Sequence, residues 1–157
     1  MTRVKTYEAQ LKGRGKKIAV VVSRFNEFVT QRLLSACLKE LARLGVPKTN
    51  TTIAWVPGSY EIPVVAMRFA RTKSIDAVIC LGCVIRGDTL HFELVAQGAA
   101  YGIMQASLQS GKPVIFGILT TDTVQQAEKR SQAKGENKGI DAAQAAVDMA
   151  NLLPMIK

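Results

Sequence analysis

The first indication of the fold is the stretch Lys17-Ile18-Ala19-Val20-Val21-Val22, a nearly continuous run of β-branched and small apolar residues. Such a run is typical of a strand buried on both faces, because a solvent-exposed face would place a polar residue at every second position. Over residues 27–44, apolar residues then recur with helical spacing, and Gly45 and Pro47 predict the end of this helix.

The alternation of strand and helix signals continues to the end of the chain. We predict further strands over residues 51–56, 76–81 and 113–120, a short helix from Glu61 or Pro63 to about residue 71, and helices over 89–109, 124–131 and 140–153. Strands separated by helices form βαβ units, which predicts an α/β fold with a parallel sheet covered by helices on both faces. No long linker interrupts the pattern, so we expect a single domain over residues 1–157. In it, residues 1–12 form an N-terminal arm, and residues 4–7 are an edge strand or part of that arm.

Composition and charge exclude several classes of protein. Apolar residues make up 48% of the 157 residues, which excludes a disordered chain, and no apolar run approaches the roughly 20 residues that span a bilayer. The N-terminal residues show no signal peptide, so we expect a cytoplasmic protein without a membrane partner. The net charge of +9 is concentrated near residues 12–17 and 129–138 without interleaved aromatics, which favours anionic small substrates over nucleic acid.

The cysteines predict packing rather than chemistry. There are three, Cys37, Cys80 and Cys83, and an odd number in a cytosolic chain argues against a disulfide framework. Cys80 and Cys83 have the C-x-x-C spacing of redox proteins, but Cys80 lies inside an apolar strand rather than at the start of a helix. With a single histidine, the chain also offers no zinc-ligand pattern, and we expect no metal.

Polar residues gather where each predicted strand ends. These ends are Ser23-Arg24-Phe25-Asn26, Pro57-Gly58-Ser59-Tyr60-Glu61, the segment 82–91, and Thr120-Thr121-Asp122-Thr123. Because ligands of open parallel sheets bind at the carboxyl ends of the strands, this edge is the expected site.

Three features of this edge indicate a chemistry. Phe25 either stacks on a planar heterocycle or plugs the sheet edge. Gly87-Asp88-Thr89 opens a helix, where free N–H groups and the helix dipole favour a phosphate, although Asp88 or Thr89 is also a candidate N-cap. His91 is the only imidazole and suits proton transfer, with a surface or packing role as the alternative. The residues alone therefore predict a site for a phosphorylated or heterocyclic small molecule, with His91 as acid or base.

Several segments together resemble the lumazine synthase family. They are Ser23-Arg24-Phe25-Asn26, residues 56–63 (VPGSYEIP), residues 81–92 (LGCVIRGDTLHF), Phe116-Gly117-Ile118-Leu119-Thr120-Thr121 and Asn137-Lys138-Gly139, and the likeness is collinear over about residues 17–151. The resemblance implies a three-layer flavodoxin-like sandwich with a four-stranded parallel sheet. It also implies an enzyme that condenses 5-amino-6-(D-ribitylamino)uracil with 3,4-dihydroxy-2-butanone 4-phosphate. The products are 6,7-dimethyl-8-ribityllumazine, phosphate and water, in the penultimate step of riboflavin biosynthesis, without cofactor or metal.

The resemblance assigns a role to each matching residue. Phe25 would stack on the pyrimidine with Asn26 beside it. Ser59, Tyr60 and Glu61 would hold the ribityl chain and ring edge, and Cys83, Val84 and Ile85 would give backbone contacts. Asp88 and Thr89 would donate backbone N–H groups to the phosphate, Arg130 would add a charged fork, and His91 would relay protons. Phe116 and Lys138 would come from an adjacent subunit or line the pocket floor.

The resemblance also concerns assembly, and here the chain lacks two glycines that the family usually has. Gln132 and Glu136 stand where the family usually has glycines, which affects the conformation expected for residues 131–138. The resemblance implies homopentamers, either free or packed into 60-subunit icosahedral shells, in which the N-terminal arm adds a strand to a neighbouring subunit. Riboflavin synthase is a candidate partner.

Two other functions remain as alternatives. A catalytically silent flavin or lumazine carrier on the same fold is less favoured, because His91 and Arg130 are both present. A basic nucleic-acid binder would bind with an affinity that falls steeply with salt concentration.

Overall fold

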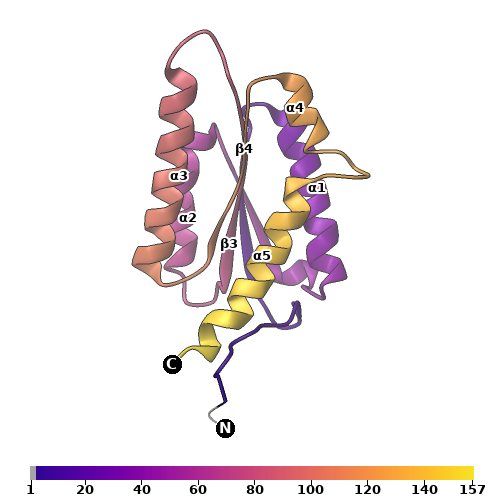
Figure 1. Cartoon of the computed structure of the whole chain (residues 1–157), viewed down its shortest axis with the longest axis vertical. Coiled ribbons are helices and arrows are strands. Elements are labelled where there is room, and N and C mark those ends of the chain that lie inside the picture. The colour runs from indigo at the N-terminus through magenta and orange to yellow at the C-terminus, as the bar shows by residue number, and fades with distance from the viewer. Residues whose placement is uncertain (1–2) are drawn as a thin grey trace.

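The computed structural model describes residues 3–157 and contains one parallel four-stranded sheet in the order β2-β1-β3-β4 (Figure 1). The strands are β1 (Ile18–Ser23), β2 (Thr51–Val56), β3 (Ala77–Ile85) and β4 (Val114–Thr121). In the centre of the sheet, Val20 pairs with Ile53 on one side and with Ile79 on the other. The predicted parallel sheet is confirmed.

Helices cover both faces of this sheet. The helices α2 (Ile62–Ala70) and α3 (His91–Ser110) lie on one face, whereas α1 (Glu27–Arg43), α4 (Val124–Lys129) and α5 (Lys138–Leu152) lie on the other (Figure 1). Short 3₁₀ turns occupy Lys48–Asn50, Ser59–Glu61 and Leu153–Met155. This arrangement is the expected three-layer flavodoxin-like sandwich.

Two hydrophobic cores explain the nearly continuous apolar run of β1. Ile18, Val20 and Val22 pack in the core under α1 and α5, while Ala19 and Val21 pack in the core under α2 and α3. Every residue of β1 is therefore fully buried. A central parallel strand has no solvent-facing side, so alternation of polar and apolar residues is absent from it.

The predicted boundaries agree with the structure to within two residues at every element except one. The prediction that the third strand ends at residue 81 is wrong, because β3 continues to Ile85. Its last residues pair with β4, from Gly82 with Ile118 to Ile85 with Thr121. The strand therefore extends past the last β1 residue that pairs with it, since Val22 pairs with Leu81.

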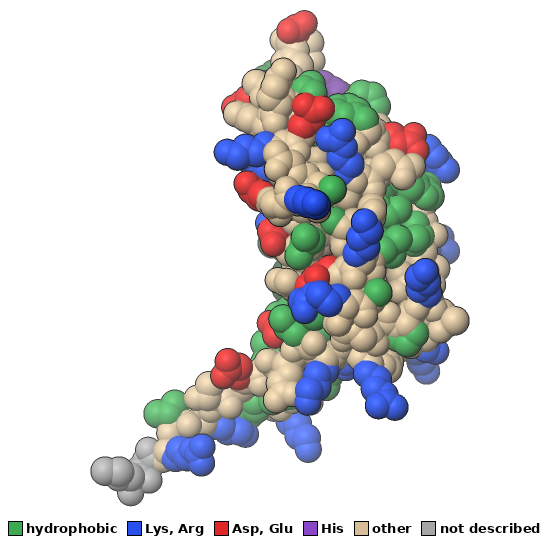
Figure 2. Space-filling model, turned by 90° about the vertical axis from the view of Figure 1, so that its right-hand side faces the viewer, with side chains coloured by type: hydrophobic (Ala, Val, Ile, Leu, Met, Phe, Trp, Pro, Cys, Tyr) green, Lys and Arg blue, Asp and Glu red, His purple; other side chains and the backbone are tan. Residues whose placement is uncertain are grey.

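The N-terminal arm lies at the end of the molecule that also holds the C-terminus (Figure 1), and it projects from the body of the protein (Figure 2). Residues 3–10 form neither helix nor strand, so residues 4–7 are not an edge strand of this chain's own sheet. The amide Nδ2 of Asn151 donates hydrogen bonds to the carbonyl oxygens of Gln10 (2.9 Å) and Lys12 (3.0 Å), which ties the base of the arm to α5. Residues 1 and 2 of the expected arm lie outside the described residues.

All three cysteines are buried and free, which confirms the core-packing prediction. Cys80 belongs to the core under α2 and α3, whereas Cys83 belongs to the opposite core, so the C-x-x-C pair lies on two faces of β3. Burial raises the pKa of the Cys83 thiol to about 12. Within residues 3–157, no helix is long and apolar enough to cross a membrane.

Candidate functional site

A cavity of about 1290 Å³ opens at the carboxyl ends of β1, β2 and β3, beside the first half of α3. It lies at the sheet edge where the strand-end residues predicted a site. Its lining includes nine of the residues that the sequence analysis singled out: Phe25, Ser59, Tyr60, Glu61, Cys83, Val84, Ile85, Thr89 and His91.

Phe25 forms one wall of the cavity with an aromatic side chain that is 72% exposed. Its backbone N–H donates to the carbonyl of Pro57 (3.0 Å), which joins the end of β1 to the end of β2. The next residue, Asn26, has a left-handed backbone (φ 58°), and its Nδ2 donates to the carbonyl of Cys83 (2.9 Å). Asn26 is outside the cavity lining and braces the turn that presents Phe25.

Ser59 places a hydroxyl group on the cavity floor. The residue is only 4% exposed, and its Oγ has no hydrogen-bond partner in residues 3–157. A buried hydroxyl without a partner is unfavourable by about 1–3 kcal/mol. A polar ligand atom at this position would satisfy it.

The extension of β3 supplies backbone groups to the same cavity. The backbone N–H of Arg86 donates to the Thr121 carbonyl of β4. Because the backbone groups of successive strand residues point to opposite sides, those of Cys83 and Ile85 point away from β4, toward the β1 side. On that side β1 has already ended as a pairing partner, and Cys83, Val84 and Ile85 line the cavity. The Cys83 carbonyl already accepts from Asn26, which leaves the backbone groups of Ile85 to bond a flat polar ring.

The segment 87–90 leads from β3 into α3, whose first residue is His91. Among the hydrogen bonds within residues 3–157, none uses the backbone N–H of Gly87, Asp88, Thr89 or Leu90 as a donor. Unpartnered N–H groups at the start of a 20-residue helix favour an anion. The alternative, a side-chain N-cap by Asp88 or Thr89, is not found: Leu90 occupies that position without a side-chain cap, and Thr89 Oγ1 accepts from His91 N at 3.3 Å.

The inner face of α3 completes the cavity and was missed by sequence reasoning. Phe92, Leu94, Val95, Gln97, Gly98 and Tyr101 also line it. Several follow His91 at helical spacing, which is the signal that could have found them. A Cβ on Gly98 would lie 2.6 Å from the Tyr60 ring, so the missing side chain lets Tyr60 pack against the helix.

Four other predicted site residues lie outside this cavity: Asp88, Phe116, Arg130 and Lys138. Asp88 is exposed on the segment before α3. Phe116 is 40% exposed on the outer strand β4, and Arg130 and Lys138 flank the loop between α4 and α5. Figure 1 shows this loop on the opposite side of the sheet from α3.

The loop between α4 and α5 is closed by its own hydrogen bonds. Ser131 and Asn137 form an antiparallel bridge, and Lys138 N–H donates to the Arg130 carbonyl at 3.0 Å. Gly135 supplies the left-handed backbone (φ 114°) that the tight turn needs, so Gln132 and Glu136 are accommodated in place of glycines. Arg130 Nη1 donates to the Gln126 carbonyl (3.0 Å), and its Nε lies 4.0 Å from a Glu136 carboxylate oxygen.

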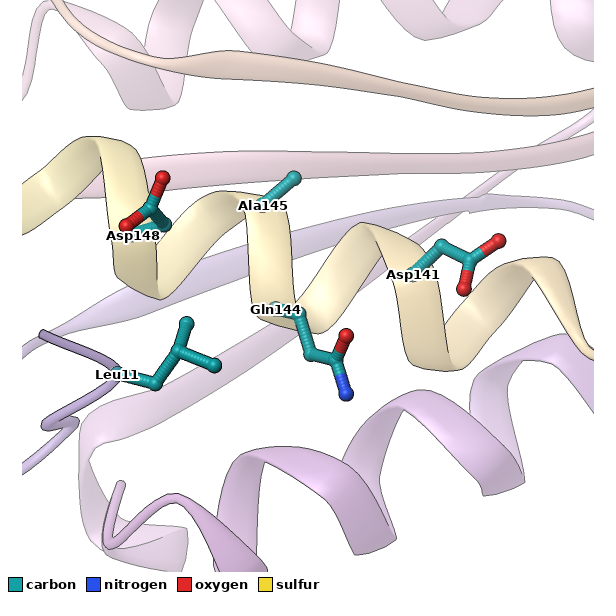
Figure 3. A pocket seen from close by; sticks show the side chains of 5 residues that line it. All are labelled: Leu11, Asp141, Gln144, Ala145 and Asp148. Atoms are coloured by element: carbon teal, nitrogen blue, oxygen red, sulfur yellow. The ribbon is translucent and has the colours of Figure 1, made fainter.

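A second, shallower hollow of about 340 Å³ lies between the arm and α5 (Figure 3). It is lined by Leu11, Asp141, Gln144, Ala145 and Asp148. Its two carboxylates would repel a phosphate, and it contains no proton-transfer group comparable to His91. In the described part of the chain, no group of three or more His, Cys, Asp or Glu side chains is placed to hold a metal ion.

Comparison with protein families agrees with this geometry. The family model described as 6,7-dimethyl-8-ribityllumazine synthase matches residues 15–154. The matched region contains every residue that lines the cavity.

Proposed function

Because the match spans residues 15–154, this chain belongs to the 6,7-dimethyl-8-ribityllumazine synthase family, and we propose that the cavity beside α3 holds both of its substrates. The family's reaction condenses 5-amino-6-(D-ribitylamino)uracil with 3,4-dihydroxy-2-butanone 4-phosphate in riboflavin biosynthesis. It yields 6,7-dimethyl-8-ribityllumazine with release of phosphate and water.

The observation that carries the assignment is the meeting of four complementary groups in one cavity. An exposed aromatic wall (Phe25), an unpartnered hydroxyl (Ser59), the unpartnered N–H groups of Gly87 and Thr89, and the only histidine (His91) meet there. The ring of the pyrimidine stacks on Phe25, and its polar edge bonds to Ser59 and to the free edge of β3. The phosphate of the second substrate binds at the start of α3.

This placement puts His91 between the two reacting molecules. The amine attacks the ketone, the adduct loses water to form an imine, phosphate leaves, and ring closure releases water. Each step moves a proton, and an imidazole at the first residue of α3 can accept and return it. Holding two reactants in contact contributes further, because such alignment is worth roughly 7 kcal/mol or more in well-oriented systems.

We further propose that a second copy of the chain supplies Arg130, Phe116 and Lys138 to the site. In one copy these residues lie on the β4 and α4 side of the molecule, away from the cavity. A head-to-tail contact that sets the β4 side of one copy against the cavity of the next brings the Arg130 guanidinium to the phosphate, and repetition of that contact closes a ring. The ring is the pentamer that the family resemblance implies.

An exposed apolar row on α3, which begins at the cavity, supports such an assembly. Leu94, Tyr101 and Leu108 are 66%, 62% and 72% exposed and recur at heptad spacing along the helix. Apolar residues at this spacing are typical of helices that pack against other helices. The arm then adds a strand to a neighbour at the open edge of β2, where Ile53 is exposed.

The activity is tested by mixing the protein with both substrates and recording lumazine fluorescence and phosphate release. Turnover well above the uncatalysed background is expected. Tight binding of the lumazine without turnover would instead support the carrier function. The cytoplasmic location and the riboflavin synthase partnership stay predictions that this assay does not address.

A mixing experiment tests the shared site. His91→Ala and Arg130→Met homo-oligomers should each have little activity, because each lacks one half of every site. When the two variants are dissociated and reassembled together, some sites receive the intact half from each copy, and activity should reappear. Absence of recovery in oligomers shown by native mass spectrometry to be mixed would contradict the shared site. The same spectra report the pentamer, and electron microscopy separates free pentamers from 60-subunit shells.

A further inference from the structure

Arg86 lies directly after β3 and is held on several sides. Its Nε donates to Asp122 Oδ1 at 2.7 Å, its Nη1 bonds to Glu93 Oε1, and its guanidinium lies over the Phe92 ring, 4.4 Å from the centroid. Its backbone N–H also bonds to the Thr121 carbonyl at 2.8 Å. One side chain thus connects the end of β3, the first turn of α3 and the loop before α4.

These contacts leave Arg86 poorly placed to bind substrate. Arg86 is not among the residues lining the cavity, although Gly87, Thr89 and His91 are. Its guanidinium is engaged by two carboxylates and one aromatic face, and these bonds raise the pKa of Arg86 further. The hydrogen bond from Arg86 holds the pKa of the Glu93 carboxyl below its usual value, so this pair favours the charged form of both side chains.

The segment that Arg86 precedes has few other restraints. A Cβ on Gly87 would meet no atom within 4 Å, and α3 begins without a side-chain cap. The 3.3 Å bond from His91 N to Thr89 Oγ1 is long for a hydrogen bond. Phe92 packs against the core under α2 and α3, and the contacts of Arg86 with Phe92 and Glu93, the two residues after His91, add a polar side-chain attachment of this turn to the end of β3.

We propose that Arg86 is a positioning residue: by bridging Glu93 and Asp122 it fixes the first turn of α3, and with it His91 and the anion-binding N–H groups, relative to the sheet. This inference rests on the proposed function, in which His91 moves protons. Both ion pairs are partly solvent-exposed and so contribute little to overall stability. The effect of Arg86 is on geometry, where a displacement of about 1 Å can lower a rate by about 100-fold.

The central test compares Arg86→Met with Arg71→Met, an exposed arginine after α2 that makes no ion pair among the described residues. Arg86→Met keeps an apolar stem over Phe92 but removes both bridges. We expect kcat to fall about 10- to 100-fold, with the KM of each substrate within about three-fold of wild type. We also expect Tm to change by only about 2–4 °C. Arg71→Met should leave all these values unchanged.

Graded variants sharpen the comparison. Glu93→Ala removes only the link to α3 and should lower kcat in the same direction. Arg86→Lys keeps the charge but cannot span both carboxylates while stacking on Phe92, so its kcat should lie between those of wild type and Arg86→Met. A KM for the phosphate substrate that rises more than kcat falls would make Arg86 a ligand and overturn the proposal. An unchanged kcat would overturn it as well.

Hydrogen–deuterium exchange supplies a test that needs no turnover. Amides of residues 87–95 should exchange faster in Arg86→Met than in wild type, while those of residues 57–62 across the cavity stay unchanged. If wild type shows no turnover, the proposed function fails while the exchange result still stands. Equal exchange in the two proteins would overturn the positioning role.

Discussion

A Cβ atom on Gly82 would lie 2.5 Å from the Ser59 hydroxyl oxygen. Gly82 is a regular position of β3 and pairs with Ile118 of β4. Because Gly82 has no side chain, Ser59 has room on the cavity floor. The close approach of Ser59 to Gly82 brings the segment after β2 against β3.

The first prediction concerns Gly82→Ala. The added methyl group should displace Ser59 and raise the KM for the pyrimidine at least several-fold. Crowding of this kind typically lowers the free energy of unfolding by about 1–3 kcal/mol. Urea denaturation and steady-state kinetics measure both effects. Gly87→Ala is the control for stability, because its Cβ meets nothing within 4 Å, and it should leave the free energy of unfolding nearly unchanged.

The second prediction is that Ser59→Ala weakens function without weakening the fold. The Ser59 hydroxyl is buried without a partner, so removing it should raise the free energy of unfolding slightly or leave it unchanged. If the hydroxyl bonds the pyrimidine, its loss should raise the Kd of the pyrimidine about 10-fold.

Ser23→Ala is the matched control for that experiment. Ser23 Oγ is also buried without a partner, but Ser23 does not line the cavity. Its replacement should affect stability in the same way and leave the Kd of the pyrimidine unchanged. Similar Kd values for wild type and Ser59→Ala in calorimetry would refute the binding role of Ser59.

The third prediction is that His91→Ala lowers kcat far more than it weakens binding. Loss of a general acid–base group typically lowers a rate about 100- to 10,000-fold. The Kd of the pyrimidine should stay within about three-fold, because its contacts lie on other elements. A loss of binding as large as the loss of kcat would indicate that His91 has a structural role.

The fourth prediction concerns Glu136, whose carboxylate oxygen lies 4.0 Å from Arg130 Nε. A carboxylate near this guanidinium competes with a phosphate, so Glu136→Gln should lower the KM for the phosphate substrate about two- to five-fold. The gain should shrink as salt rises from 0.05 to 0.5 M, because exposed charges are screened over about 10 Å or less. Glu128→Gln, which removes a carboxylate without an ion pair among the described residues, should leave the KM unchanged.

The fifth prediction is a pH-dependent contribution of Glu40 to stability. The hydrogen bond from Arg43 holds the pKa of this carboxyl below its usual value, and Gln144 of α5 also donates to it. A lowered folded-state pKa stabilises the protein above about pH 4.5, and this contribution is lost as pH falls through the folded-state pKa. Glu40→Gln should therefore lower Tm at pH 7 and have little effect near pH 2. An equal effect at both pH values would argue against the charge as the cause.

Much of the fold was predictable because local periodicity reports burial. The apolar run of β1 indicated a strand between two layers, and the leucine spacing of α1 indicated a helix with one buried face. The exception was β3, whose glycine at position 82 suggests an end to the strand. The strand continues through Gly82, and Ser59 occupies the space that a side chain there would fill. The residues next to Gly82 in the sequence do not indicate that Ser59 lies beside it.

The location of the candidate site, at the carboxyl edge of the sheet, was predictable from the sequence. Which residues contact one another there was not. The carboxyl ends of parallel strands share one edge, so polar strand ends were enough to locate the cavity. The contacts of Arg86 with Glu93 and Asp122, and the position of Arg130 outside the cavity, depend on how the loops pack against each other.

The sequence by itself determined the elements, the two-sided burial of the sheet and the polar residues at its edge, because each follows from the spacing of side chains along a short segment. Only the tertiary structure decided which of those residues meet. The order β2-β1-β3-β4 brings Phe25, Ser59 and Cys83 together around one cavity and leaves Phe116 on the outer strand. Strand order is set by packing between distant segments, so it determines which residues one copy of the chain can bring to the site.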